Sequence, residues 1–137
     1  MSDPATRPRP QFRNLNLQML LTYRQPPAAK TSILHRISGA LLVLSLPLVV
    51  VPLFGLSITS PESFAGMAAW VGNPLCKLVL LVLIWAYMHH FCAGIRYITL
   101  DLHFGNSREA SQRSGAIVIG VSLGLTFIFA LKLFGVW

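Results

Sequence analysis

Charged side chains are scarce in this sequence, because Asp, Glu, Lys and Arg make up 11% of its 137 residues and hydrophobic residues 54%. Soluble domains contain about 25% charged residues, so this chain cannot cover itself with a polar surface. The apolar residues form three runs, 37–58, 78–95 and 114–131, each long enough to cross a bilayer core about 30 Å thick. The sequence therefore predicts an all-α integral membrane protein with three transmembrane helices, at about 30–56, 74–100 and 112–135.

Carboxylates are absent from the three apolar runs, since Glu62, Asp101 and Glu109 lie in connections or at helix ends. A transporter or channel usually needs an ionisable group or a polar stripe at membrane depth, so the sequence disfavours that class. The two cysteines, Cys76 and Cys92, fall on one predicted helix and are too far apart to form a disulfide.

Basic residues are unevenly distributed along the chain. Nine of the eleven Lys and Arg residues precede the first apolar run or lie around the second connection, which leaves two elsewhere. The nine are Arg7, Arg9, Arg13, Arg24, Lys30, Arg36, Arg96, Arg108 and Arg113, and the two are Lys77 and Lys132. The positive-inside rule then predicts that the N-terminus and the second connection face the cytoplasm or a mitochondrial matrix. The location we expect is a bacterial inner membrane, with the N-terminus cytoplasmic and the C-terminus periplasmic. The basic charge therefore indicates orientation, and we expect no nucleic-acid partner.

Residues 1–29 are polar and contain several prolines, which prevent a continuous amphipathic helix. We expect this segment to be an extended basic arm on the cytoplasmic side. Residues 30–137 then form the three-helix transmembrane domain.

Three polar residues, Ser32, His35 and Arg36, come just before the first apolar run. If they begin the helix, they stand at i, i+3 and i+4 and share one face near the membrane surface. A polar ligand could bind there. The alternative is an interfacial anchor, in which Arg36 extends to lipid phosphates.

Two adjacent histidines, His89 and His90, lie inside the second apolar run. Ionisable groups at that depth are costly and usually functional. The pattern leaves four roles open: haem ligand, proton relay, metal site, and hydrogen bonding between helices. Adjacent helical residues diverge by about 100°, so the two imidazoles cannot both bind one iron.

His90 shares a helical stripe with Gly94, Tyr97 and Asp101. Gly94 could admit a porphyrin or a neighbouring backbone, or could simply serve helix packing. Arg96, near the end of this helix, could pair with a haem propionate or with a lipid phosphate.

A haem bound by His90 would lack its second axial ligand in this chain. His35 is expected near the surface of another helix, and His103 lies in a connection. The haem hypothesis therefore predicts half of a haem-binding helical bundle, completed by a second membrane subunit.

Four motifs point to a known family: SxxHR at 32–36, HxxxGIR at 90–96 followed by Asp101, SPESF at 60–64, and NLNLQ at 14–18. With the three-span layout, they make the chain resemble the cytochrome b subunits of succinate dehydrogenase, which are membrane anchors of respiratory complex II. Three positions depart from the pattern, and one of them is Leu100, where an aromatic residue or Met is common. Tyr97 stands where many relatives have His or Phe, and His89 is an additional histidine beside the expected one.

The resemblance implies a four-subunit enzyme, in which a flavoprotein oxidises succinate and an iron-sulfur subunit passes electrons to ubiquinone at the membrane. It implies that His90 ligates haem b together with a histidine of a second anchor, and that His35 lies near a propionate. Ser32 and Arg36 would line the quinone pocket. The chain would not itself bind succinate. The alternatives are the anchor of a fumarate reductase that uses menaquinone, and a scaffold without haem.

Overall fold

The computed structural model describes residue 18 and residues 22–136, and the regular structure of these residues is helical. Three helical stretches are long and apolar enough to cross a membrane: Pro27–Thr59, Pro74–Asp101 and Arg108–Leu133. The prediction of an all-α protein with three spans is confirmed. Most of the predicted N-terminal arm lies outside the described residues.

The first span consists of α2 (Pro27–Ser45), a π-helical turn η2 (Leu46–Val50) and α3 (Val51–Thr59). Pro47 has no N–H for the helical ladder, and its ring crowds the preceding turn. The helix accommodates it by widening, and the N–H of Val51 bonds the carbonyl of Leu46. The span thus continues past its prolines instead of ending at them.

The connection to the second span is itself helical: α4 comprises Pro61–Val71. Ser60 begins it with a reciprocal cap, in which Ser60 Oγ accepts from Ser63 N and Ser63 Oγ accepts from Ser60 N. The second span is α5 (Pro74–Asp101), capped by the side chain of Asn73.

The third span, α6, comprises Arg108–Leu133. It begins at Arg108 instead of near residue 112 because Ser107 Oγ accepts a hydrogen bond from Ala110 N. Between the second and third spans, His103 adopts a φ of 66° where the chain leaves α5.

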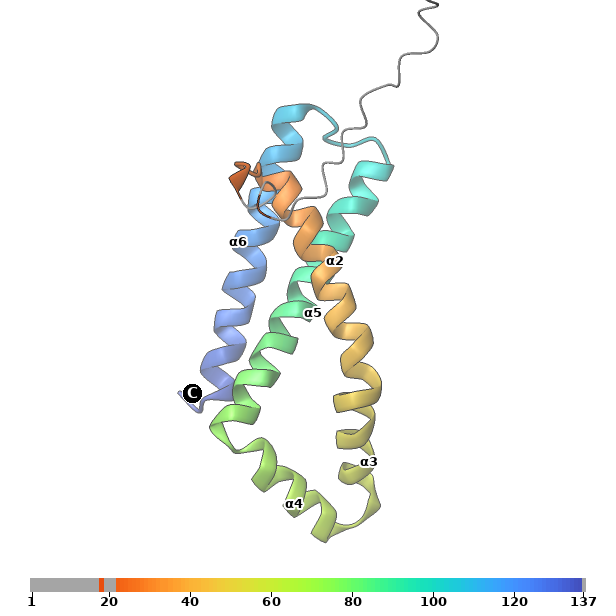
Figure 1. Ribbon diagram of the computed structural model, residues 1–137, viewed down its shortest axis with the longest axis vertical. Helices are drawn as coiled ribbons and strands as arrows, with labels where there is room; N and C mark the ends of the chain where they lie inside the picture. The colour runs from red at the N-terminus through yellow and green to blue at the C-terminus, as the bar shows by residue number, and fades with distance from the viewer. Residues whose placement is uncertain (1–17, 19–21, 137) are drawn as a thin grey trace, which may run out of the picture.

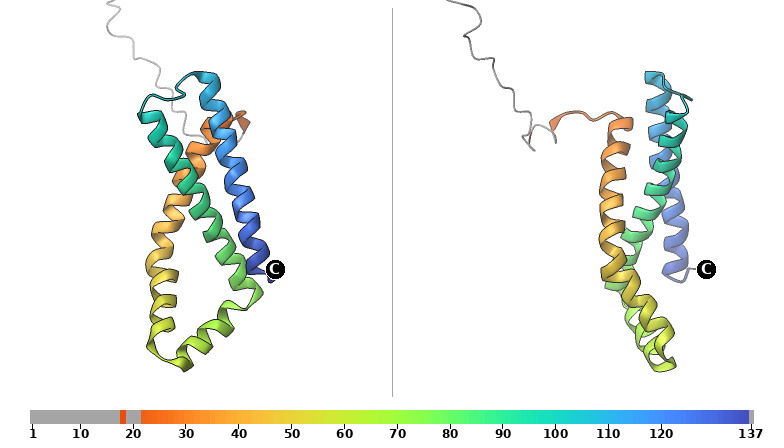
Figure 2. Two further views of the ribbon diagram at one scale, coloured as in Figure 1. Left: turned by 180° about the vertical axis from the view of Figure 1, so that it is seen from behind. Right: turned by 90° about the vertical axis from the view of Figure 1, so that its right-hand side faces the viewer.

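The helices α2, α5 and α6 contact one another at the end where α2 begins and α5 ends, the upper end in Figure 1. The side view in Figure 2 shows α5 running obliquely between α6 and the first span. Among the described residues, α3 packs on α4 and not on α5. A groove of about 450 Å³ opens where the first span diverges from α5, and its lining is almost wholly apolar.

The contact between α2 and α6 is close because small residues meet there. A Cβ added at Gly115 would lie 2.9 Å from both N and Cα of Ala28. Thr31 Oγ1 donates to the carbonyl of Gly115 at 2.9 Å, and Ala28 N donates to Gln112 Oε1 at 3.0 Å. These contacts fix α2, and with it the polar residues of its first turns, against the bundle.

Candidate functional site

His89 lies on the face of α5 that packs against α6, and its side chain is fully buried. Its Nδ1 is 3.1 Å from Ser122 Oγ, and the Ser122 hydroxyl donates to the carbonyl of Ile119. Since the single hydroxyl hydrogen is used there, His89 Nδ1 is the donor to Ser122. The remaining nitrogen, Nε2, is enclosed and has no partner among the described residues. Trp85 stacks on the ring, with centroids 5.6 Å apart.

Arg96, two turns further along the same face, is only 6% exposed. Its Nε donates to Ser114 Oγ at 2.9 Å, and its Nη2 donates to the hydroxyl and carbonyl oxygens of Ser111 at 3.0 and 3.1 Å. The sequence predicted that this guanidinium pairs with a haem propionate or a lipid phosphate near the cytoplasmic end of the helix. The structure turns it inward onto α6, where Nη1 has no partner among the described residues.

His90 lies on the face of α5 that points toward α2, and it is half-buried. Its Nδ1 is 3.1 Å from the carbonyl oxygen of His35 and 3.3 Å from Ser38 Oγ. Because a carbonyl only accepts, Nδ1 carries the proton, and Nε2 of the neutral ring keeps a free lone pair. A Cβ at residue 39 would lie 2.9 Å from Cε1 of His90, so Gly39 allows this close approach.

His35 stacks on His90, with ring centroids 4.1 Å apart and an interplanar angle of 10°. Tyr97 lies against His35, at 5.1 Å and 51°. The stripe predicted from His90 to Tyr97 thus meets α2 at His35.

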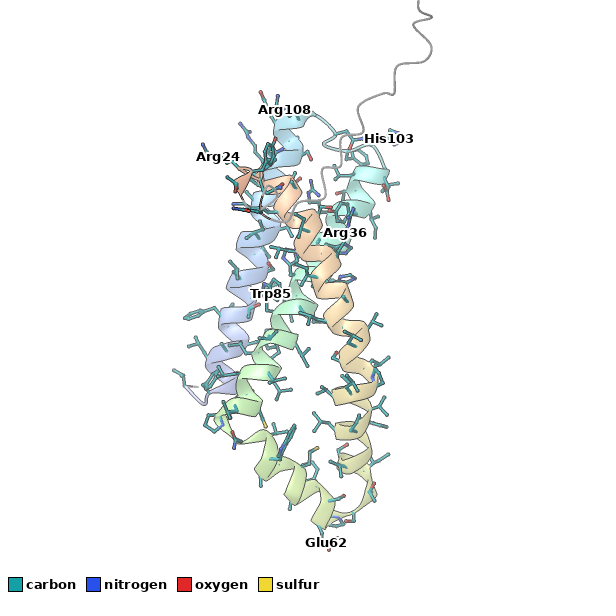
Figure 3. All side chains as sticks on the ribbon, viewed as in Figure 1. Arg24, Arg36, Glu62, Trp85, His103 and Arg108 are labelled. Carbon is teal, nitrogen blue, oxygen red and sulfur yellow. The ribbon has the colours of Figure 1, made fainter. Side chains whose placement is uncertain are left out.

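Ser32 and Arg36 flank His35 on α2, and Figure 3 labels Arg36 beside the crossing of α2 with α5. Ser32 is half-buried and Arg36 is exposed. Among the described residues, neither side chain has a hydrogen-bond or ion-pair partner. Every other Ser and Thr hydroxyl in that part of the chain takes part in a hydrogen bond. Ser32 is therefore distinguished by a hydroxyl left available to a ligand.

Sequence reasoning missed the residues that hold the two histidines in place, chiefly Ser38, Gly39 and Ser122. The sequence feature that could have identified these residues is the presence of Ser and Gly inside otherwise apolar runs, which is typical of close helix contacts in membranes. Among the described residues, no three His, Cys, Asp or Glu side chains are grouped so as to hold a metal ion.

Fold and site together define a three-span membrane protein with two differently oriented imidazoles in its second helix. The family model described as "Succinate dehydrogenase/Fumarate reductase transmembrane subunit" matches residues 6–129, and the chain belongs to this family. It is therefore a multi-pass membrane subunit of a succinate dehydrogenase or fumarate reductase. The family resemblance read from the motifs is confirmed.

Individual relatives agree with this assignment. The chain is 34% identical over 116 residues to the succinate dehydrogenase cytochrome b556 subunit of Paracoccus denitrificans, covering 84% of this chain and 88% of the relative. It is 36% identical over 126 residues to the subunit of the same name from Coxiella burnetii, covering 91% and 95%. The corresponding subunit of Rickettsia felis is 25% identical over 109 residues.

Proposed function

We propose that this chain is the membrane anchor and cytochrome b subunit of succinate dehydrogenase, and that it binds haem b through His90. We further propose that Ser32 and Arg36 form part of the site where ubiquinone receives electrons from the iron-sulfur subunit. The observation that carries the proposal is the state of His90, whose Nδ1 is held by the His35 carbonyl while Nε2 is free.

The geometry of His90 fits an iron ligand. Histidines that bind metals usually donate the other ring N–H to a carbonyl or carboxylate, which fixes the tautomer and the ring orientation. His89 also has a free Nε2, but that atom is enclosed between α5 and its neighbours. Bound haem b would supply a one-electron redox centre. The second axial imidazole would come from another membrane anchor.

The environment of Ser32 and Arg36 supports a role in binding the quinone. The Ser32 hydroxyl can donate to a quinone carbonyl oxygen, and the Arg36 guanidinium can stabilise negative charge that develops on the quinone during reduction. Both groups lack partners in the described chain, so binding a ligand there breaks no existing hydrogen bond.

His35 and Arg96 are proposed to lie near the haem propionates. His35 stacks directly on His90, the proposed iron ligand. In Arg96, Nε and Nη2 already donate to Ser114 and Ser111. Nη1 is therefore the nitrogen available to a haem propionate.

The proposed complex contains a flavoprotein, an iron-sulfur subunit and a second small anchor in addition to this chain. The charge distribution supports an inner-membrane orientation with the N-terminus in the cytoplasm and the C-terminus in the periplasm. The upper end in Figure 1, which holds Ser32 and Arg36, then faces the cytoplasm and the iron-sulfur subunit.

The test replaces Ser32 or Arg36 by Ala in the intact complex. We expect succinate-dependent ubiquinone reduction to fall about tenfold or more in Arg36→Ala, because a lost charge-assisted hydrogen bond contributes about 1.5–3 kcal/mol, and about three- to tenfold in Ser32→Ala, which loses a neutral hydrogen bond. Succinate oxidation with a soluble acceptor should stay unchanged. Ser57→Ala is the control, because the Ser57 hydroxyl bonds only the carbonyl of Phe54. Equal loss of both activities in the Ser32 and Arg36 variants would contradict a role in quinone binding.

A further inference from the structure

Tyr97 is held in a fixed place between two other side chains. Its ring lies against His35, with centroids 5.1 Å apart, and the guanidinium carbon of Arg96 lies 5.3 Å from the ring centroid. Arg96 is itself bonded to α6 and His35 is stacked on His90. Tyr97 is therefore not a freely rotating tyrosine of the kind that extends to the membrane surface.

The phenolic oxygen of Tyr97 has no hydrogen-bond partner among the described residues, although the side chain is half-buried. This oxygen is accessible, because the buried side-chain N or O atom without a partner among the described residues is Nε2 of His89. An unpaired polar group is costly in a bilayer, so an accessible phenol here is available to a ligand. The Ser32 hydroxyl and the Arg36 guanidinium also lack partners, and both lie within a helical turn of His35. Three unpaired donors thus surround one residue, His35, at the crossing of α2 and α5.

The helix also leaves room at this place. Gly94 lies between His90 and Tyr97 on the same stripe, and a Cβ added there would meet nothing within 4 Å. Packing within this chain does not account for a glycine at this position. The open space lies on the stripe of α5 that carries Tyr97.

We propose that Tyr97 is a third ligand-binding residue of this site, whose phenolic O–H donates to an oxygen of the ligand that contacts Ser32 or Arg36. The inference rests on the proposed function and adds a donor to it. Two oxygen acceptors share the required chemistry: a quinone carbonyl and a haem carboxylate. A phenolic O–H can donate a hydrogen bond to either acceptor.

The experiment compares Tyr97→Phe, Tyr97→Leu and Tyr97→His in the intact complex in membranes. Tyr97→Phe keeps the ring contact with His35 and removes only the hydroxyl. Tyr97→His offers an N–H donor in place of the hydroxyl. Tyr87→Phe is the matched control, because Tyr87 is on the same helix, is 57% exposed and stacks on Phe91 away from His35. The probe is ubiquinone with a short tail, and the second readout is a redox titration of the haem spectrum.

If the acceptor is a quinone carbonyl, Tyr97→Phe should raise the KM for ubiquinone about three- to tenfold, as expected for loss of one neutral hydrogen bond. The haem potential should stay constant, and Tyr97→His should restore part of the affinity. If the acceptor is a haem carboxylate, Tyr97→Phe should shift the haem potential and leave the KM unchanged. Either change, absent from Tyr87→Phe, supports the donor role.

The inference is overturned if Tyr97→Phe matches the wild type in both readouts. It is equally overturned if only Tyr97→Leu is impaired, because the ring alone would then matter. Ser32→Ala, measured in the same membranes, separates this failure from failure of the proposed function. A raised KM in Ser32→Ala with a normal Tyr97→Phe rejects only the role of Tyr97, whereas two normal variants place the quinone site elsewhere.

Discussion

The two faces of α5 differ in how far the chain satisfies its own polar groups. Toward α6, His89, Ala93 and Arg96 are buried, and the two polar side chains bond to serines of α6. Toward α2, His90 and Tyr97 are half-buried and their unpaired atoms are accessible, whereas the enclosed unpaired atom among the described residues, Nε2 of His89, lies on the α6 face. The first face is closed by the chain itself, and the second is left open.

This difference teaches how to interpret polar residues in a membrane helix. In a bilayer the hydrophobic effect does not hold helices together, so packing and hydrogen bonds between helices do. Polar residues whose groups are paired within the chain serve that purpose. Polar residues that share a face and stay unpaired indicate a ligand or another subunit. On α5 the adjacent residues His89 and His90 belong to these two different classes, because successive helical residues point about 100° apart.

The largest expected effect comes from substituting His89 and His90 separately. His90→Ala removes the proposed axial ligand, so the purified complex should lose most of its haem. His89→Gln keeps an amide that can bond Ser122, so haem content should stay near that of the wild type. The measurement is the reduced-minus-oxidised spectrum, normalised to covalent or extracted flavin. Loss of haem in His89→Gln with retention in His90→Ala would reverse the assignment of the two faces.

A smaller effect is expected from adding one methyl group to α6. Gly115→Ala places a Cβ 2.9 Å from the backbone of Ala28, which cannot move without displacing α2. We expect destabilisation of about 1–3 kcal/mol, typical of overpacking, seen as a lower Tm of the detergent-solubilised protein.

Gly120→Ala is the matched control on the same helix, because a Cβ there meets nothing within 4 Å. It should be neutral or stabilising by up to about 1 kcal/mol, since Ala has the higher helix propensity. Equal loss of stability in both variants would show that the outer face of α6 is packed as tightly in the complex as its inner face.

The spans were predictable from the sequence because a bilayer requires long apolar helices, and runs such as 37–58 satisfy that requirement without tertiary information. The stripe containing His90 and Tyr97 was likewise a matter of helical geometry. The inward turn of Arg96 was not predictable, because it depends on the rotation of α5 relative to Ser111 and Ser114 of another helix. The free hydroxyl of Ser32 could not be predicted either, since it becomes distinctive only when the other hydroxyls are seen to be paired.

The smallest expected effect lies on α4, away from both faces of α5. A hydrogen bond from the Ser60 side chain lowers the pKa of the exposed Glu62 carboxyl from its ordinary value of 4.5, and the backbone amide of Glu62 adds to this. A lowered folded-state pKa means that the ionised carboxylate stabilises the fold at neutral pH. That contribution declines as the pH falls below 4.5 and is lost once the pH passes the lowered pKa.

Ser60→Ala should therefore raise the pKa of Glu62 toward 4.5, as measured by carbon NMR titration of protein labelled at its glutamates in detergent. Glu62→Gln assigns the Glu62 signal, since Glu109 is the other glutamate. Because α4 lies at the end of the molecule opposite the crossing of α2 and α5 (Figure 1), haem content and ubiquinone reduction should not follow this titration. If haem content or ubiquinone reduction changed as the Glu62 carboxyl titrates, the open face of α5 would be coupled to the opposite end of the protein.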